Sequence, residues 1–153
     1  RLRAEVLLDA INDVLGTTET MDALPPGSRS TQLWTHRSGS TFLDTFGRPD
    51  PNQDPPCERM PDSTTPQILH LMNSPRLNQK LKDDAGRIAT MAQSTLENTA
   101  IVEQLYLLVY CRLPSAEEIR KTTEYLAGQS NRRVALEDLF WTLLTTPEFL
   151  FVD

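Results

Sequence analysis

The stretch NTAIVEQLYLLVYC, residues 98–111, decides the fold. Apolar residues recur in it at the spacing of one buried face of an α-helix, at Ile101, Val102, Leu105, Leu108 and Val109. Leu107 and the flanking tyrosines leave this segment little polar surface, so we expect a helix at the centre of the fold. Arg112 suits the negative end of the helix dipole, and Pro114 prevents the helix from continuing.

Downstream of this helix, the boundaries of two more helices are readable. Ser115 and Glu118 form a capping box, in which the serine hydroxyl bonds the amide of Glu118 and the glutamate reaches back. The helix that follows is predicted to end at Gly128. A last long helix spans about residues 132–145, and a final turn begins at Thr146.

Upstream, the apolar spacing over residues 2–15 predicts a helix that Gly16 terminates in the left-handed conformation. Thr65 and Ser74 each precede a proline, which predicts two short helices, and Asp83 is expected to cap a third that contains Gly86. The sequence therefore predicts an all-α bundle of about six helices. Arg1 already lies inside a helical pattern, so we expect residues 1–153 to be one domain, the C-terminal fragment of a larger protein.

The segment 17–65 has neither helical nor strand periodicity, and eight of the eleven prolines lie between Pro25 and Pro66. Proline removes a backbone donor and fixes φ, which excludes a continuous helix or a central strand. We expect an irregular segment that packs across the bundle, with a short strand near residues 32–35 or 40–43. Long irregular segments in compact domains often carry function.

Charge and composition restrict the partners. The formal net charge is −6, which repels phosphate backbones, so nucleic acid is not an expected partner. No apolar run reaches the roughly 20 residues that a membrane span needs. Cys57 and Cys111 are the two cysteines, and both a disulfide between them and two free thiols stay open.

The irregular segment supplies the candidate interaction surface, because it combines aromatic, basic and acidic side chains that no core pattern claims. Its members are Trp34, His36, Arg37, Phe42, Asp44, Arg48, Cys57 and Arg59. Arg48 and Arg59 flank an acidic run, and we expect them to pair with its aspartates and hold the segment on the helices. Loop carboxylates are also calcium ligands, but the spacing of an EF-hand is absent.

The patterns of catalytic and cofactor sites are missing from the sequence. Covalent haem attachment needs two closely spaced cysteines followed by histidine, and zinc needs clustered ligands. His70 lies among leucines and is interpreted as structural. No nucleophile elbow or phosphate-binding loop occurs. We therefore predict no catalytic residues, no metal and no cofactor in this chain.

Three stretches together resemble the planctomycete-type domain of unknown function numbered 1553. They are residues 1–10, residues 65–74, and residues 105–118 with the terminal 147–153; residues 42–49 and 57–59 resemble the middle of the family. Cys111 departs from the small residue expected at its position. The resemblance implies an exported, periplasmic, cell-envelope or extracellular protein, in which this domain follows other domains that include a haem-carrying cytochrome c-like module.

These observations favour a non-catalytic structural or protein-interaction module, with the upstream domains of the same polypeptide or another protein as partner. The alternative is a carbohydrate-binding or carbohydrate-processing accessory, in which Trp34, Tyr106 and Tyr110 stack on sugar rings. A third hypothesis is a docking face for the upstream haem, with His36 as an axial ligand.

Overall fold

The computed structural model describes residues 2–35, 38–49 and 65–151, and within them the chain forms nine helices, one 3-10 turn and no strand. The elements are α1 (Ala4–Leu15), η1 (Ser30–Gln32), α2 (Thr41–Thr45), α3 (Thr65–Asn73), α4 (Pro75–Leu81), α5 (Arg87–Gln93), α6 (Asn98–Tyr110), α7 (Ala116–Gly128), α8 (Arg132–Leu144) and α9 (Pro147–Leu150). The predicted all-α class is confirmed.

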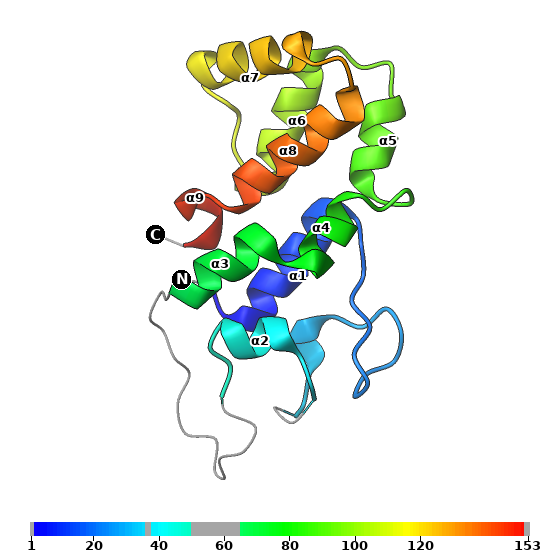
Figure 1. Cartoon of the computed structure of the whole chain (residues 1–153), viewed down its shortest axis with the longest axis vertical. Helices are drawn as coiled ribbons and strands as arrows, with labels where there is room; N and C mark the ends of the chain where they lie inside the picture. The colour runs from blue at the N-terminus through cyan, green and yellow to red at the C-terminus, as the bar shows by residue number, and fades with distance from the viewer. Residues whose placement is uncertain (1, 36–37, 50–64, 152–153) are drawn as a thin grey trace.

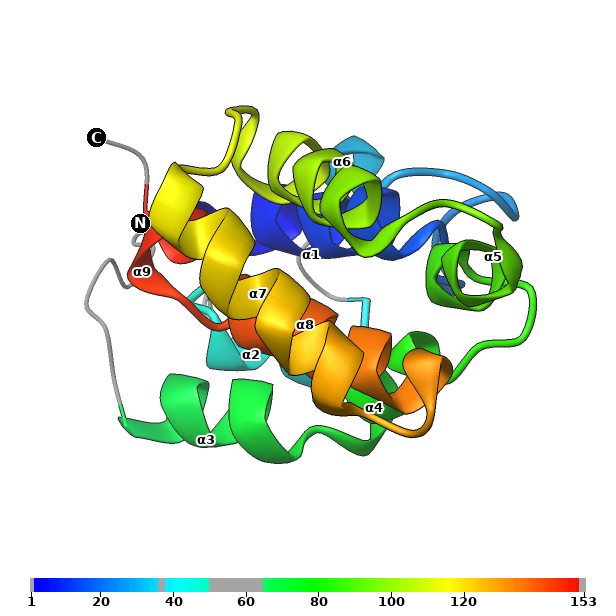
Figure 2. The ribbon, with the colours of Figure 1, turned by 90° about the horizontal axis from the view of Figure 1, so that it is seen from above.

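The elements form two groups. Helices α1 to α4 and η1 make one end of the molecule, and α5 to α8 make the other, with α9 returning beside the N-terminus (Figure 1). The amide of Leu2 donates to the carbonyl of Leu150 at 3.1 Å, so the two ends of the described chain lie side by side. Viewed from above, α7 crosses α8 and α3 lies at the edge of the molecule (Figure 2).

One apolar core joins the two groups. The side chains that are almost fully buried come mainly from α1, α6 and α8, and include Leu7, Ile11, Leu15, Ile101, Leu105, Leu136, Phe140 and Leu144. Helix α6 is central as expected, because Ile101, Val102 and Leu105 have no exposed surface. Its burial is one-sided, however, and Leu107 on the outer face keeps 48% of its surface exposed.

The prediction of about six helices was too low for the described residues. Helices α4 and α5 and the turn that forms α9 were expected, but α2 was not, because a helix of five residues shows too little periodicity to be recognised from sequence. Ser74 caps α4 as predicted, and its hydroxyl accepts from the Leu77 amide at 3.4 Å.

Two other helix starts differ from the prediction. Helix α3 begins at Thr65 itself, which was expected to be the cap. The expected cap Asp83 instead accepts from the Ala85 amide at 2.9 Å and closes a turn, and Gly86 occupies the cap position of α5. An aspartate two residues before an amide closes such a turn as readily as it caps a helix.

Gly16 ends α1 with φ +66°, the left-handed conformation expected of it. A Cβ at this position would lie 3.4 Å from Arg87, so α5 also approaches the backbone closely here. This is a position where the absence of a side chain serves both the helix end and the contact between α1 and α5.

The described residues of the irregular segment pack on α1 through η1 and α2, and no strand forms at residues 32–35 or 40–43. Residues 30–32 form η1, and Ser40 caps α2 by accepting from the Leu43 amide at 3.3 Å. The buried Asp9 carboxylate of α1 accepts from the amides of Ser30 at 2.6 Å and Thr31 at 3.0 Å. Burial alone would raise the pKa of Asp9, but these hydrogen bonds outweigh it and lower the pKa.

Two leucines of α6 test the position of the core. We expect Leu105→Ala to lower the free energy of unfolding by about 2–5 kcal/mol, because it leaves a cavity in a fully buried place. The matched change Leu107→Ala on the exposed face should cost about 0.5 kcal/mol or less. Urea denaturation of both variants measures the difference, and equal losses would contradict the assigned orientation of α6.

Candidate functional site

Half of the predicted interaction surface can be placed. Trp34 is 80% exposed, and Asp44 is also exposed. Phe42 is half-buried against the core, and its ring stacks on Phe46 with 4.4 Å between the ring centroids. The other four predicted members, His36, Arg37, Cys57 and Arg59, lie outside the described residues.

Arg48 is not a surface residue. Its side chain is only 2% exposed, and its Nε donates to the Asp44 carboxylate at 2.7 Å, one helical turn earlier. The expected pairing of Arg48 with an aspartate is therefore found, while its predicted place on the interaction surface is wrong. This hydrogen bond joins the residue after Gly47 back to α2.

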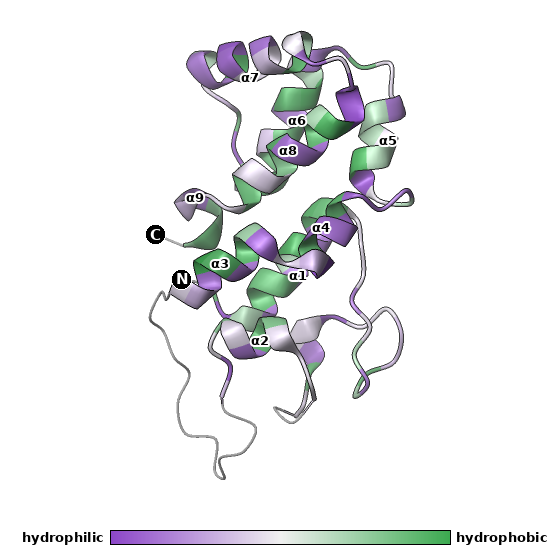
Figure 3. Ribbon diagram, viewed as in Figure 1, coloured by the Kyte–Doolittle hydropathy of each residue, from purple (hydrophilic) through white to green (hydrophobic). Residues whose placement is uncertain are grey.

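Helix α3 carries an exposed apolar face. Ile68, Leu69 and Met72 are 57%, 52% and 49% exposed, whereas Gln67 and Leu71 point into the protein. In the hydropathy view, the ribbon of α3 has both green apolar and purple polar segments (Figure 3). We call Ile68, Leu69 and Met72 the α3 face.

A shallow groove continues from the α3 face towards α8. Met72, Leu81 and Trp141 form its apolar part, and its volume is about 270 Å³. Lys82, Glu137 and Asp138 stand at its edge. The sequence predicted helix α3 but not which of its apolar residues are exposed, because Ile68, Leu69, Leu71 and Met72 in so short a helix do not reveal which side faces the core.

A second, more apolar hollow opens on the other side of α3, between α1, α2 and α4. Its volume is about 310 Å³, at the lower end of the range for small-molecule pockets. Leu8 and Ile11 of α1, Phe42 of α2 and Leu77 of α4 form its walls. His70 lies at one side, with its ring edge-on to Phe42 at 5.6 Å.

Burial lowers the pKa of His70 from the ordinary value of 6.5 and so favours the uncharged imidazole. Its ring also stands edge-on to Phe46, with 5.9 Å between the centroids. The predicted structural role of His70 agrees with this aromatic cluster.

The rim of the hollow is charged. The Glu19 carboxylate lies 2.9 Å from the Arg76 guanidinium and 2.9 Å from the Lys80 ammonium. Lys80 also donates to Asn12 Oδ1 at 2.6 Å and to the Thr18 carbonyl at 3.1 Å. Arg76, in contrast, is largely exposed.

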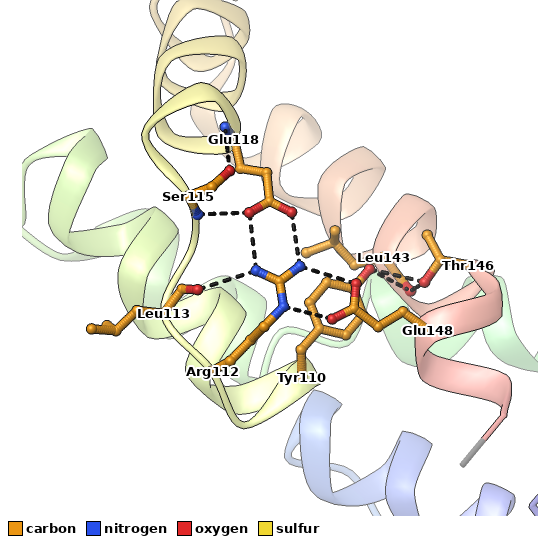
Figure 4. A network of polar contacts seen from close by, with 8 residues as sticks. All are labelled: Tyr110, Arg112, Leu113, Ser115, Glu118, Leu143, Thr146 and Glu148. Carbon is orange, nitrogen blue, oxygen red and sulfur yellow. Dashed lines mark hydrogen bonds and ion pairs between the residues drawn. The ribbon is translucent and has the colours of Figure 1, made fainter. Parts of the chain in front are cut away.

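The densest polar cluster of the described residues surrounds Arg112, just after α6 (Figure 4). Nη1 and Nη2 donate to the two oxygens of Glu118 at 3.0 and 2.8 Å, and Nε and Nη2 donate to Glu148 at 2.6 and 3.0 Å. Nη1 also donates to the Leu113 carbonyl at 3.1 Å. All donors of the guanidinium are therefore used in joining the end of α6 to the starts of α7 and α9.

The capping box predicted at the start of α7 forms part of this cluster. The Glu118 carboxylate accepts from the Ser115 amide at 2.7 Å, and the Ser115 hydroxyl accepts from the Glu118 amide at 3.3 Å. Hydrogen bonds from Arg112 and from Ser115 lower the pKa of Glu118 to about 2. The same carboxylates raise the pKa of Arg112 above its ordinary value. These polar groups are directed at one another and join the end of α6 to the starts of α7 and α9. We call Arg112, Ser115, Glu118 and Glu148 the Arg112 clasp.

The two tyrosines of the predicted sugar platform lie beneath this clasp. The Arg112 guanidinium is 5.4 Å from the ring centroids of both Tyr106 and Tyr110. Tyr106 is buried, and the Tyr110 hydroxyl is within 2.9 Å of the Thr146 hydroxyl. Neither ring presents an open face for stacking on a sugar.

Within the part of the chain that the structure describes, no three or more His, Cys, Asp or Glu side chains are grouped so that they could hold a metal ion. No helix in the same part has the length and apolar character needed to cross a membrane. Cys111 is exposed and adopts φ +56° at the end of α6, and Cys57, the other cysteine, lies outside this part.

Comparison with known proteins gives one match. The model of the family PSD1, described as a protein of unknown function (DUF1553), matches residues 1–126. Among curated proteins and solved structures, nothing matches the chain.

The Arg112 clasp has a predicted pH dependence. Since the pKa of Glu118 is about 2 in the folded protein and about 4.5 in the unfolded chain, its stabilisation is complete above about pH 4.5 and is lost as the pH falls towards 2. We expect Arg112→Met to lower the free energy of unfolding by about 1 kcal/mol at pH 7, because the pair is partly exposed and screened by solvent.

The difference between Arg112→Met and the unaltered protein should narrow as the pH falls from 5 to 3, as measured by chemical denaturation at each pH. The control Arg120→Met removes an exposed pair with Glu124 in α7 and should change stability by less than about 0.5 kcal/mol. A difference that stays constant with pH would show that the clasp does not act through its carboxylates.

Proposed function

We propose a non-catalytic role in protein interaction for this chain, which belongs to the PSD1 family, a family of proteins of unknown function (DUF1553). The observation that carries the proposal is the α3 face. Three large apolar side chains, each about half exposed, lie on one short helix and continue into the groove beside Trp141.

The arrangement suits an apolar partner surface. Ile68 and Met72 are four residues apart and therefore neighbours on the helix, with Leu69 beside them. Contiguous apolar side chains in water favour association, because covering them releases the water that they order. Lys82, Glu137 and Asp138 would then form the polar rim that gives such a contact its orientation.

Outside the α3 face, the charged side chains of Arg112 and Arg133 support a structural role and not a catalytic one. Arg112 is occupied by two glutamates, and Arg133 of α8 lies between Glu137 and Asp84. Catalytic acids and bases need a polar group directed at open space, whereas these groups are directed at one another.

The proposal includes a location and a partner. We place the protein outside the cytoplasm, in the periplasm, the cell envelope or the medium, and take upstream domains of the same polypeptide, including a cytochrome c-like domain, as the first partners. What supports this part is the resemblance of the three sequence stretches to the family, and the family match over residues 1–126.

Carbohydrate binding is the second candidate function, and the exposure of Trp34 favours it. An indole that is 80% exposed offers a free face for stacking on a sugar ring. Since Tyr106 and Tyr110 are covered by Arg112, Trp34 would have to act without them. Binding on a glycan array that disappears in Trp34→Ala would favour this function over the first.

Photo-crosslinking tests the α3 face directly. A photoreactive phenylalanine analogue placed at Met72 in the full-length protein should crosslink to a defined protein or domain in the native cell. The matched control position is Leu113, which is equally accessible but lies near the Arg112 clasp, and it should give no such product. Equal crosslinking from both positions, or none from Met72, would contradict the proposal.

Substitution gives a quantitative test of the same contact. We expect Ile68→Ser combined with Met72→Gln to weaken association with the crosslinked partner at least tenfold, because central apolar residues dominate interface energies. The melting temperature should change little, since both side chains are half exposed. Unchanged association in a folded variant would exclude the α3 face as the interface.

A further inference from the structure

The hollow between α1, α2 and α4 is separate from the α3 face. His70 and Ser74 line the hollow, and Ser74 is one residue beyond the end of α3. At 100° per residue, these two positions lie on the side of the helix opposite Ile68, Leu69 and Met72. A ligand in the hollow and a protein on the α3 face would therefore contact different side chains.

The walls of the hollow favour a hydrocarbon. Leu8, Ile11, Phe42 and Leu77 are apolar and come from three different helices. They are held rigidly, because Leu8, Ile11 and Leu77 belong to the main core. A volume of about 310 Å³ admits a ligand of small-molecule size.

The charged side chains at the rim of the hollow favour a ligand with one negative charge. Arg76 and Lys80 stand against the single carboxylate of Glu19, so the rim has an excess of positive charge. This excess stands out in a chain with a formal net charge of −6. An anionic group at the mouth would be attracted, and a cationic group would be repelled by the same two side chains.

Lys80 and Arg76 differ in how many of their donors are available to an anionic ligand. The three donors of Lys80 are directed at Glu19, Asn12 and Thr18, all within 3.1 Å. Arg76 approaches Glu19 with one nitrogen, Nη1 at 2.9 Å, and its largely exposed side chain is among those that line the hollow. Guanidinium binds carboxylates through paired hydrogen bonds, which makes Arg76 the expected contact.

We propose that this hollow binds a small amphiphile with a hydrocarbon chain and one carboxylate, such as a medium-chain fatty acid. The chain lies against Leu8, Ile11, Leu77 and Phe42, and the carboxylate accepts from Arg76. His70 lies at one side of the hollow, where burial lowers its pKa and so favours its uncharged form.

Three probes of eight carbons each test the charge of the ligand. Octanoate, octylamine and octanol carry an anionic, a cationic and an uncharged head group, and NMR titration of the side-chain resonances of Leu77 and Phe42 reports binding at the hollow. We expect octanoate to bind at least tenfold more tightly than octylamine, with octanol between them. Octylamine binding as tightly as octanoate, or no shift with octanoate up to its solubility, would overturn the proposal.

Two substitutions at the rim should change the affinity for octanoate in opposite directions. Arg76→Gln should weaken octanoate binding about threefold to fivefold, whereas the matched exposed variant Arg120→Gln should leave it unchanged. Glu19→Gln should tighten it about threefold or more, because it removes the carboxylate that competes for Arg76. A gain in affinity cannot arise from unfolding, so weaker binding in a folded Glu19→Gln protein would overturn the assigned role of the rim.

A blocking variant locates the ligand. Thr41 is exposed at the mouth of the hollow, and Thr41→Trp should abolish the shifts of Leu77 and Phe42 with octanoate while the circular dichroism spectrum stays unchanged. Persistent octanoate binding in this variant would place the site elsewhere. The double variant of the α3 face should bind octanoate normally.

Discussion

Helix α8 is in contact with α4, α5, α6, α7 and α9, and Leu136, Phe140 and Leu144 on its inner side have no exposed surface. A helix of this length is marginal in water by itself, so its stability comes from covering that apolar side. Three of these neighbours, α4, α5 and α9, have seven residues or fewer. The burial of α8 therefore holds in position α4, α5 and α9, which have little helix stability of their own.

Polar contacts determine the paths of loops and the orientation of short helices, which the apolar core alone does not determine. Apolar burial is non-directional, so it does not determine where a loop crosses a helix. The Asp9 carboxylate does this for the segment after α1, because it accepts the amides of Ser30 and Thr31 in a buried place. Arg112 does the same at the opposite end, where it fixes α9 against the start of α7. These two clusters position the surfaces, and neither is itself a site.

The sequence predicted the elements whose signals are local. The periodicity of α6 and the capping box at Ser115 are both properties of neighbouring residues, and both are found. The bond from Arg112 to Glu148 joins residues 36 positions apart, so only the dipole role of Arg112 could be inferred. Arg48 was assigned to the surface because a charged residue in a Pro-rich segment is usually exposed, and the short helix α2 that buries it had no periodic signal.

The candidate surfaces were harder to predict for a related reason. An apolar residue is interpreted as core unless tertiary structure shows otherwise, and on α3 the sequence offers apolar residues on most sides. Only the contacts of Gln67 and Leu71 show which side is inward. The hollow depends on α1, α2 and α4 meeting, with Leu8 and Leu77 brought together from distant parts of the chain. No local pattern contains that information.

Helix α3 connects the two surfaces physically. Its buried contacts are few, with Gln67 and Leu71 as its inward residues, so its local stability is low compared with that of α6 or α8. A protein that covers Ile68 and Met72 would hold α3 in place, and would thereby hold His70 against Phe42 at the side of the hollow. A ligand in the hollow would stabilise the same helix from the opposite side. Linkage requires that each bound partner then strengthen the binding of the other by the same factor, because both draw on the one ordering of α3.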